Sequence, residues 1–167
     1  MSGIVVLPGD GKTVHLGGLG VVYKLSGAET GGSFALVEHP LEPGTLGAPL
    51  HLHHNEDEYS YVLEGEVTVL VGERVIQATP GTLIAKPRGI FHTFLNAGSV
   101  PARVLEIIAP AGLEGYFEEV AQLAAAGVPL EDPRRMLLAE KYNVEFDRSR
   151  IMELVQKYNL KLPGPPR

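Results

Sequence analysis

Four of the six histidines in this 167-residue chain lie between residues 50 and 96, close to a run of acidic residues. His51 and His53 are two residues apart, and residues at that spacing in an extended strand point to the same face. Their imidazole rings therefore converge, while His54 takes the opposite face. Neutral imidazole is a common metal ligand, so this spacing predicts one half of a metal site.

The other half of the predicted site comes from two further strand-like runs. Glu58 lies five residues past His53, across a short polar turn, so that a hairpin would return its carboxylate to the two histidines. His92 opens a third run and supplies a fourth ligand. Imidazole and carboxylate together suit Fe, Mn, Ni, Co, Cu or Zn, and the absence of cysteine excludes thiolate ligands. We expect one divalent transition metal of open identity on His51, His53, Glu58 and His92.

Two glycine-marked patterns surround these residues. The first, G-x5-H-x-H-x4-E-x6-G, fits from His51 to Gly65, although only three residues instead of five separate Gly47 from His51. The second, G-x5-P-x-G-x2-H-x3-N, is matched in full by Gly81, Pro87, Gly89, His92 and Asn96. These patterns resemble the two motifs of the cupin superfamily. The resemblance implies a small jelly-roll barrel that holds its metal on His51, His53, Glu58 and His92, but it implies no particular reaction.

The composition favours a mainly β fold. Most of the 20 glycines and 13 prolines precede residue 115, which suits many short strands joined by tight turns. Beyond Pro110 the apolar residues recur at helical spacing. We therefore expect a cupin barrel with an N-terminal arm over residues 1–110, and a helical extension over residues 111–167 packed on the same domain.

Some details of this outline can be predicted from local signals. Residues 9–20 are rich in glycine and are expected to form an arm with turns. In the extension, Asp132 followed by Pro133 is typical of a helix start, and Asp147 is expected to cap a later helix. His15 and His39 stand apart from the motifs, so we expect them to lie at the surface or to be satisfied by structural hydrogen bonds.

The charge and hydropathy of the chain limit its partners. A net charge of −6 disfavours nucleic acid and anionic membranes, and residues 112–160 hold nine acidic residues against six Lys or Arg. No apolar run approaches the ~20 residues needed to span a bilayer, so we expect a cytoplasmic protein. The apolar strand faces near residues 67–71, together with the amphipathic extension, favour a homodimer.

Three classes of function fit these predictions. The favoured one is a metal-dependent dioxygenase, because the motifs, size and helical extension resemble quercetinase-like monocupins, which cleave flavonols. Glu58 would be its general base. The alternatives are an isomerase or epimerase of a sugar or keto acid, and a protein that binds a small ligand without converting it. Only Lys86 and Arg88 provide cations near the motifs, which counts against phosphorylated substrates.

Overall fold

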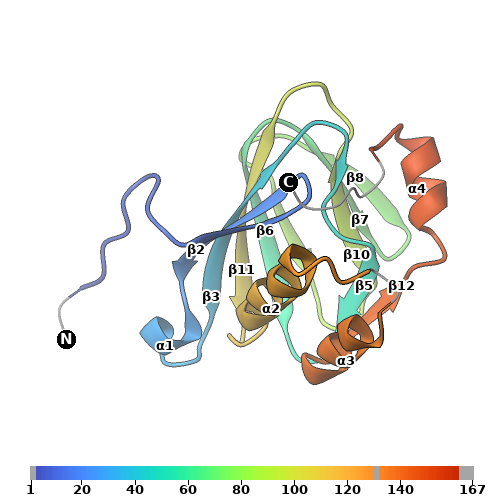
Figure 1. The fold of residues 1–167 in the computed structure, drawn as a ribbon. Coiled ribbons are helices and arrows are strands. Elements are labelled where there is room, and N and C mark those ends of the chain that lie inside the picture. The colour runs from blue at the N-terminus through green and yellow to red at the C-terminus, as the bar shows by residue number, and fades with distance from the viewer. Residues whose placement is uncertain (1–2, 130–131, 162–167) are drawn as a thin grey trace.

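Two antiparallel sheets form the body of the computed structural model, which describes residues 3–129 and 132–161 (Figure 1). The first sheet has the strand order β1 (Thr13–Leu16), β2 (Leu19–Leu25), β3 (Ala35–Leu41), β11 (Ala102–Ala109), β6 (Asp57–Glu64) and β9 (Leu83–Lys86). The second has the order β12 (Val144–Asp147), β5 (Leu50–His53), β10 (His92–Asn96), β7 (Val67–Val71) and β8 (Arg74–Ala78), with β4 (Thr45–Leu46) also paired to β10. The prediction of a mainly β barrel followed by helices is confirmed.

Strand β11 illustrates how the sequence builds this barrel. Ala102, Val104, Glu106 and Ile108 are buried, and the residues between them are partly exposed, as the two-residue period of a strand requires. The inward residues join a core that both sheets share, including Val62 on β6 and Val69 on β7. A charged residue, Glu106, therefore stands in a row of interior positions.

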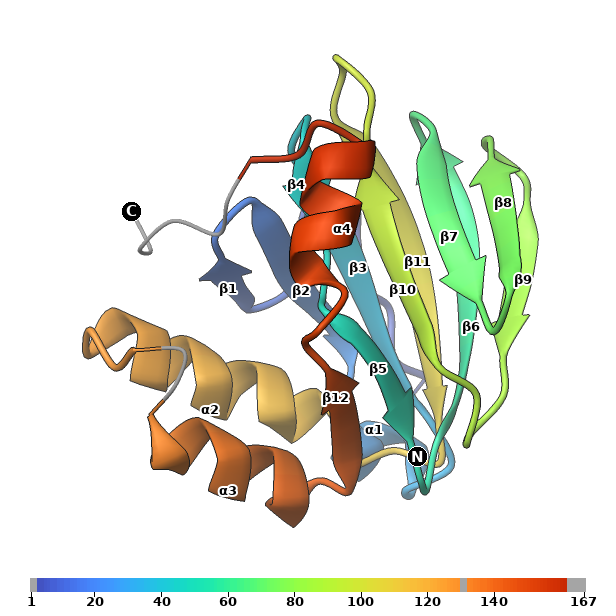
Figure 2. The same cartoon turned by 90° about the vertical axis from the view of Figure 1, so that its right-hand side faces the viewer.

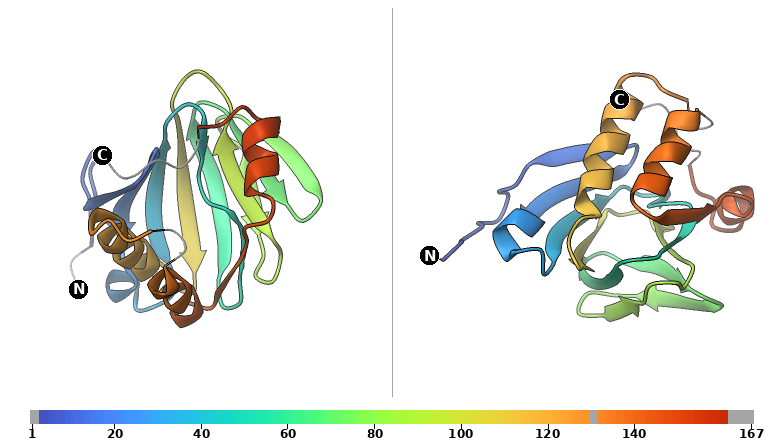
Figure 3. Two further views of the ribbon diagram at one scale, coloured as in Figure 1. Left: turned by 45° about the vertical axis from the view of Figure 1, so that its right-hand side comes forward. Right: turned by 90° about the horizontal axis from the view of Figure 1, so that it is seen from below.

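Four helices accompany the strands in the described part of the chain: α1 (Gly27–Thr30), α2 (Glu114–Ala125), α3 (Pro133–Lys141) and α4 (Ile151–Lys157). Helices α2 and α3 lie side by side next to the barrel (Figure 3), and α2 also contacts β1. Helix α4 lies against the second sheet (Figure 2), where Leu154 and Val155 pack on Leu70 and Leu95.

Two local predictions need correction. The glycine-rich arm contains β1, which forms a hairpin with β2. The two strands pair up to Leu16 and Leu19, and Gly17 adopts the positive φ that the tight turn between them requires. Asp132 caps α3 by accepting a hydrogen bond from the backbone N–H of Arg134, as predicted. Asp147 does not cap α4, because it ends β12 and its carboxylate accepts from Ser149 instead; the capping position belongs to Arg150.

The C-terminal extension, meaning residues 111–129 and 132–161, is part of the second sheet as well as a set of helices. Its strand β12 pairs antiparallel with β5, the strand that carries His51 and His53. The extension therefore lies directly beside the predicted metal ligands. None of the described helices is both long and apolar enough to cross a membrane.

Candidate metal centre

The structure brings the four predicted ligands together inside the barrel. His51 and His53 point inward from β5, and His92 on β10 lies opposite His51 in the strand register. Glu58 reaches the same point from β6 in the facing sheet. All four residues are buried, and one ligand atom from each lies within 4.8 Å of the others.

Hydrogen bonds orient two of the rings. The Nδ1–H of His51 donates to the carbonyl oxygen of Pro49 at 2.8 Å, and that of His92 donates to Ile90 at 2.9 Å. Burial lowers the pKa of His92 in spite of its contact with Glu58, and burial together with the charges of the neighbouring histidines holds the pKa of His51 well below its usual value, so the neutral form of each ring is favoured. Each Nε2 therefore keeps a lone pair, as a metal ligand must.

The arrangement of the four side chains would be stabilised by a cation bound between them. The lone pair on His92 Nε2 faces a carboxylate oxygen of Glu58 at 3.1 Å, and two such acceptors repel each other unless a proton or a cation lies near both. Both ring nitrogens of His53 are buried without a hydrogen bond among the described residues, although Nε2 lies 3.4 Å from Glu58. Three imidazoles and one carboxylate thus fit a divalent transition metal.

Glu58 is held as a carboxylate by its neighbours. Burial alone would raise its pKa, but the ammonium group of Lys86 and the ring of His53 hold that pKa well below the usual value. The Nζ of Lys86 lies 2.8 Å from Glu58 and 2.9 Å from Glu106, inside the barrel. Lys86 is therefore the counter-ion of the candidate metal ligand.

Lys86 and Glu106 were not among the predicted site residues. Lys86 is only 1% exposed and is engaged with two carboxylates, so it is no free cation for a substrate. Burial raises the pKa of Glu106 to about 7 in spite of Lys86, and the nearby charge of Glu58 adds to the rise. Ser60 donates a hydrogen bond to Glu106 at 2.8 Å. The two-residue spacing of Lys86 from buried Ile84 was the signal that Lys86 faces inward.

Other residues near the motifs lie apart from the cluster. His54 is exposed and lies 3.5 Å from Glu145 at the surface. Arg88 pairs with Asp57 outside the barrel. Glu56 lies in the polar turn between His53 and Glu58 but is buried, and one of its oxygens has no partner among the described residues. These residues can support the site only indirectly.

His39 also lies inside the barrel. Its Nδ1 lies 3.1 Å from the carbonyl oxygen of Gly20, and its ring packs between Phe94 and Phe117. Burial lowers the pKa of His39 to about 4, so the ring is neutral and its Nε2 is a hydrogen-bond acceptor. The expected structural hydrogen bond is present, but the ring also lines the cavity next to the candidate metal centre.

That cavity has a volume of about 900 Å³. His51, His53 and Glu58 lie on its barrel side. The C-terminal extension supplies the opposite side with apolar and aromatic residues, including Leu113, Tyr116, Phe117, Val128, Phe146 and Ile151. Arg135 and Arg148 line it as well. The volume lies within the range of small-molecule sites, so the candidate metal centre opens on a space that can hold a substrate.

Residues 37–108 match the family described as Cupin domain, and this match covers both motifs and all four candidate ligands. The two antiparallel sheets that carry this match have the cupin fold. No curated protein matches the chain by sequence.

Many solved structures are similar in fold, and three of them illustrate the range. One is a sugar phosphate isomerase from a cupin superfamily, from Silicibacter pomeroyi; it is 27% identical with a TM-score of 0.50, and the alignment covers 55% of this chain and 59% of that one. KdgF from Halomonas is 17% identical with a TM-score of 0.59, over 68% and 99% of the two chains. A predicted oxalate decarboxylase from Thermotoga maritima is 21% identical with a TM-score of 0.59, over 64% and 99%.

Proposed function

We propose that this chain is a metal-dependent isomerase or epimerase that acts on a sugar or a keto acid. The observation that carries this proposal is the buried cluster of three histidines and Glu58 at the side of a cavity of about 900 Å³. The likeness to the Silicibacter pomeroyi protein, a sugar phosphate isomerase by its description, supports it over the dioxygenase that the motifs favoured. Because the chain spans 59% of that protein, the activity itself stays a proposal.

The chain's own residues can move the proton that such a reaction requires. A bound divalent metal would polarise the substrate carbonyl and lower the pKa of an adjacent hydroxyl. The carboxylate of Glu58 would accept the proton from the carbon next to the carbonyl. In an isomerisation it would return that proton to the former carbonyl carbon while the hydroxyl proton passes to the former carbonyl oxygen, and in an epimerisation it would return the proton to the opposite face of the same carbon. Lys86 keeps Glu58 ionised for this role, and His39 can accept a hydrogen bond from a substrate hydroxyl.

A dioxygenase is a second candidate because of one feature of the cavity. Phe94, Phe117 and Phe146 line it, and such rings suit a flat aromatic substrate such as a flavonol. A third possibility, a protein that binds a ligand without converting it, needs no general base. The three functions therefore differ in what they require: only the dioxygenase consumes oxygen, and only the two enzymes need Glu58 and the metal for turnover.

One experiment separates them. Protein purified without chelators is analysed for metals, loaded with the metal found, and incubated with sugars, keto acids and flavonols. NMR follows interconversion, and an oxygen electrode follows oxygen uptake. We expect interconversion of a sugar or keto acid without oxygen uptake, and a loss of about 10²–10⁴-fold in rate for Glu58→Gln. Oxygen uptake with a flavonol would establish the dioxygenase instead, and binding without conversion would contradict both enzymes.

A further inference from the structure

We propose that Arg135 and Arg148 of the C-terminal extension form an oxyanion-binding subsite in the same cavity, so that the substrate carries a carboxylate or a phosphate. That the substrate binds the metal is part of the proposed function, on which this inference rests. That the substrate also carries an anionic group is a separate inference, drawn from residues other than the metal ligands. A ligand of this class would place its chelating oxygens at the histidines and its charged group at the extension.

Arg135 is a buried cation whose hydrogen bonds go only to uncharged groups. It is 8% exposed and lines the cavity from α3. Its Nε and Nη2 donate to the carbonyl oxygens of Val128 and Pro129 at 2.9 to 3.3 Å. Within residues 3–129 and 132–161, no carboxylate forms an ion pair with it, although its charge acts on the nearby carboxylate of Asp132, and its Nη1 makes no hydrogen bond. Because a buried charge is costly without a counter-ion, a bound oxyanion would complete this environment.

Arg148 follows β12 and lies close to the candidate metal centre. Its guanidinium carbon lies 5.7 Å from the centre of the Phe146 ring. That ring is in turn 5.6 Å from the ring of His51. One aromatic ring thus separates the guanidinium from a candidate metal ligand. A small substrate can reach both groups within the single cavity that they line.

Tyr116 connects the two arginines. Its ring lies 6.2 Å from that of Phe146, and it lines the cavity from α2. Burial raises the pKa of the phenol, whereas the charges of Arg148 and Arg135 both act to lower it, as expected if the two cations flank it. Among the described residues no group accepts a hydrogen bond from the phenol, so Tyr116 can donate one to the same oxyanion.

The charge distribution makes these cations distinctive. The chain carries a net charge of −6, and two of the acids that line the cavity, Glu58 and Glu106, are already paired with Lys86. The cations that were missing near the motifs are therefore supplied by the extension. Guanidinium groups bind carboxylate and phosphate through paired N–H donors, which makes them selective for such oxyanions.

The test compares probes that share a hydroxy-ketone but differ in charge. Calorimetry measures the binding of fructose, fructose 6-phosphate and 2-ketogluconate to metal-loaded and metal-free protein. We expect one of the charged probes to bind more tightly than fructose, and its identity distinguishes phosphate from carboxylate. Arg135→Gln should weaken the binding of that probe by about 10- to 100-fold and leave the affinity for fructose unchanged. Arg135→Lys, which keeps the charge, should retain part of the affinity.

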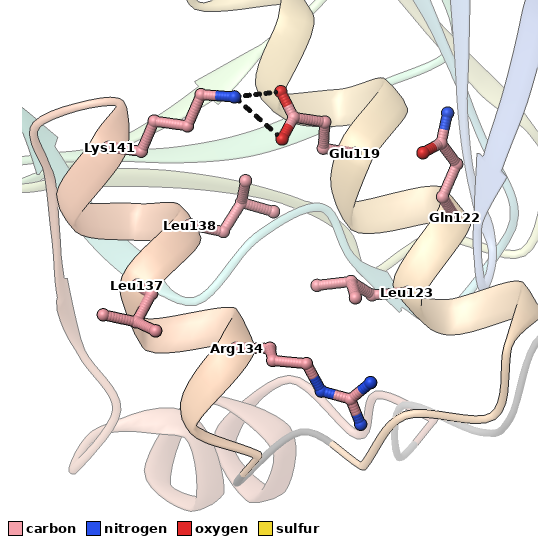
Figure 4. Close-up of a pocket in the computed structure, with 7 residues that line it drawn as sticks. All are labelled: Glu119, Gln122, Leu123, Arg134, Leu137, Leu138 and Lys141. Atoms are coloured by element: carbon pink, nitrogen blue, oxygen red, sulfur yellow. Dashed lines mark hydrogen bonds and ion pairs between the residues drawn. The ribbon is translucent and has the colours of Figure 1, made fainter.

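Arg134 offers a matched control on the same helix. It is 61% exposed, pairs with Asp132, and borders the outer groove between α2 and α3 (Figure 4). Arg134→Gln removes the same charge outside the cavity and should leave all three affinities unchanged. The inference is wrong if neither charged probe binds better than fructose, or if Arg135→Gln weakens charged and neutral probes alike.

The proposed function and the subsite can fail separately. In metal-free protein, part of the affinity for the charged probe should remain and should still depend on Arg135, because the subsite does not include the metal ligands. A protein that binds a charged probe in this way yet converts no sugar or keto acid would refute the proposed function and support the subsite. Loss of all Arg135-dependent binding without metal would refute the subsite as a separate element.

Discussion

Phe146 on β12 pairs in register with His51 on β5, and their rings lie 5.6 Å apart. This pairing places the C-terminal extension against the first of the candidate metal ligands. The barrel alone holds the cluster, but the space beside the cluster is bounded by residues from both parts of the chain.

The metal ligands can be tested by substitution. His51→Ala or His53→Ala should remove most bound metal, because each deletes an imidazole that converges on the cluster. His54→Ala is the matched control, since His54 is exposed next to Glu145, and it should keep the metal content of the parent. Elemental analysis of the purified variants measures both. Full metal content in a His51→Ala, His53→Ala double variant would refute this ligand set.

Removing Lys86 should destabilise the protein. Lys86→Met leaves Glu58 and Glu106 buried without their shared counter-ion, and breaking such a pair costs about 3–5 kcal/mol. Adding Glu106→Gln removes one of the stranded carboxylates, so the double variant should recover part of the loss. Urea denaturation of the metal-free proteins gives the three free energies of unfolding. If the single variant loses under about 1 kcal/mol, the ion pair has no such role.

His39 should make stability depend on pH. The folded ring takes up a proton only near pH 4, whereas an unfolded histidine does so near 6.5, so the unfolded chain binds more protons between these values. Stability should therefore fall as the pH drops from 6.5 to 4, by about 3 kcal/mol from this residue. His39→Phe should reduce the loss over that range by about this amount in urea denaturation of metal-free protein, and the pH dependence that remains is expected from His51 and His92, whose pKa values are also lowered by burial. His15→Phe, at an exposed position, should leave the curve of the parent unchanged.

Helix α4 should contribute to stability through its buried face. Leu154 is buried against Leu70 and Leu95 of the second sheet, so Leu154→Ala should cost about 2–5 kcal/mol. Met152→Ala on the exposed face of the same helix should cost less than about 1 kcal/mol. Thermal or urea unfolding compares the two variants. Equal effects would mean that α4 does not pack on the sheet in solution.

The homodimer stays a prediction. The strand faces near residues 67–71 and the amphipathic extension no longer favour it by themselves, because Val67, Val69 and Leu70 are buried within the chain and α4 packs on Leu70. The feature that still favours it is the exposure of apolar side chains such as Val75 and Leu83 on the strands that end the two sheets. Pairing such edges between subunits protects them from water and from other chains. Sedimentation at micromolar concentration should show a species of twice the 17.9 kDa chain mass. A single monomeric species under those conditions would contradict it.

The barrel and the cluster were accessible from sequence because their signals are local. The His-x-His spacing, the turn before Glu58 and the alternation along β11 each depend on neighbouring residues. Lys86 was visible as a cation, but its partner Glu106 lies on another strand, so the ion pair needed the strand order.

The remaining features depend on contacts between distant segments. Strand β12 is only four residues long and pairs with β5, a partner that its own sequence does not indicate. Arg135 and Arg148 belong to an extension whose net charge is negative. That net charge gives no sign that the two arginines line the cavity. Asp147 was assigned to a helix cap because nothing local distinguishes a cap from the last residue of a strand.

The pairing of β12 with β5 joins two parts of the chain that would have different roles in the same site. Residues that would hold the metal stand on barrel strands, whereas many of the other residues that line the cavity, Arg135 and Arg148 among them, stand on a separate segment joined to the barrel edge. Substitutions in that segment can change which molecule is accepted without disturbing the ligand set. The substrate preference of this protein could therefore diverge, or be engineered, by exchanging the extension while the barrel is left unaltered.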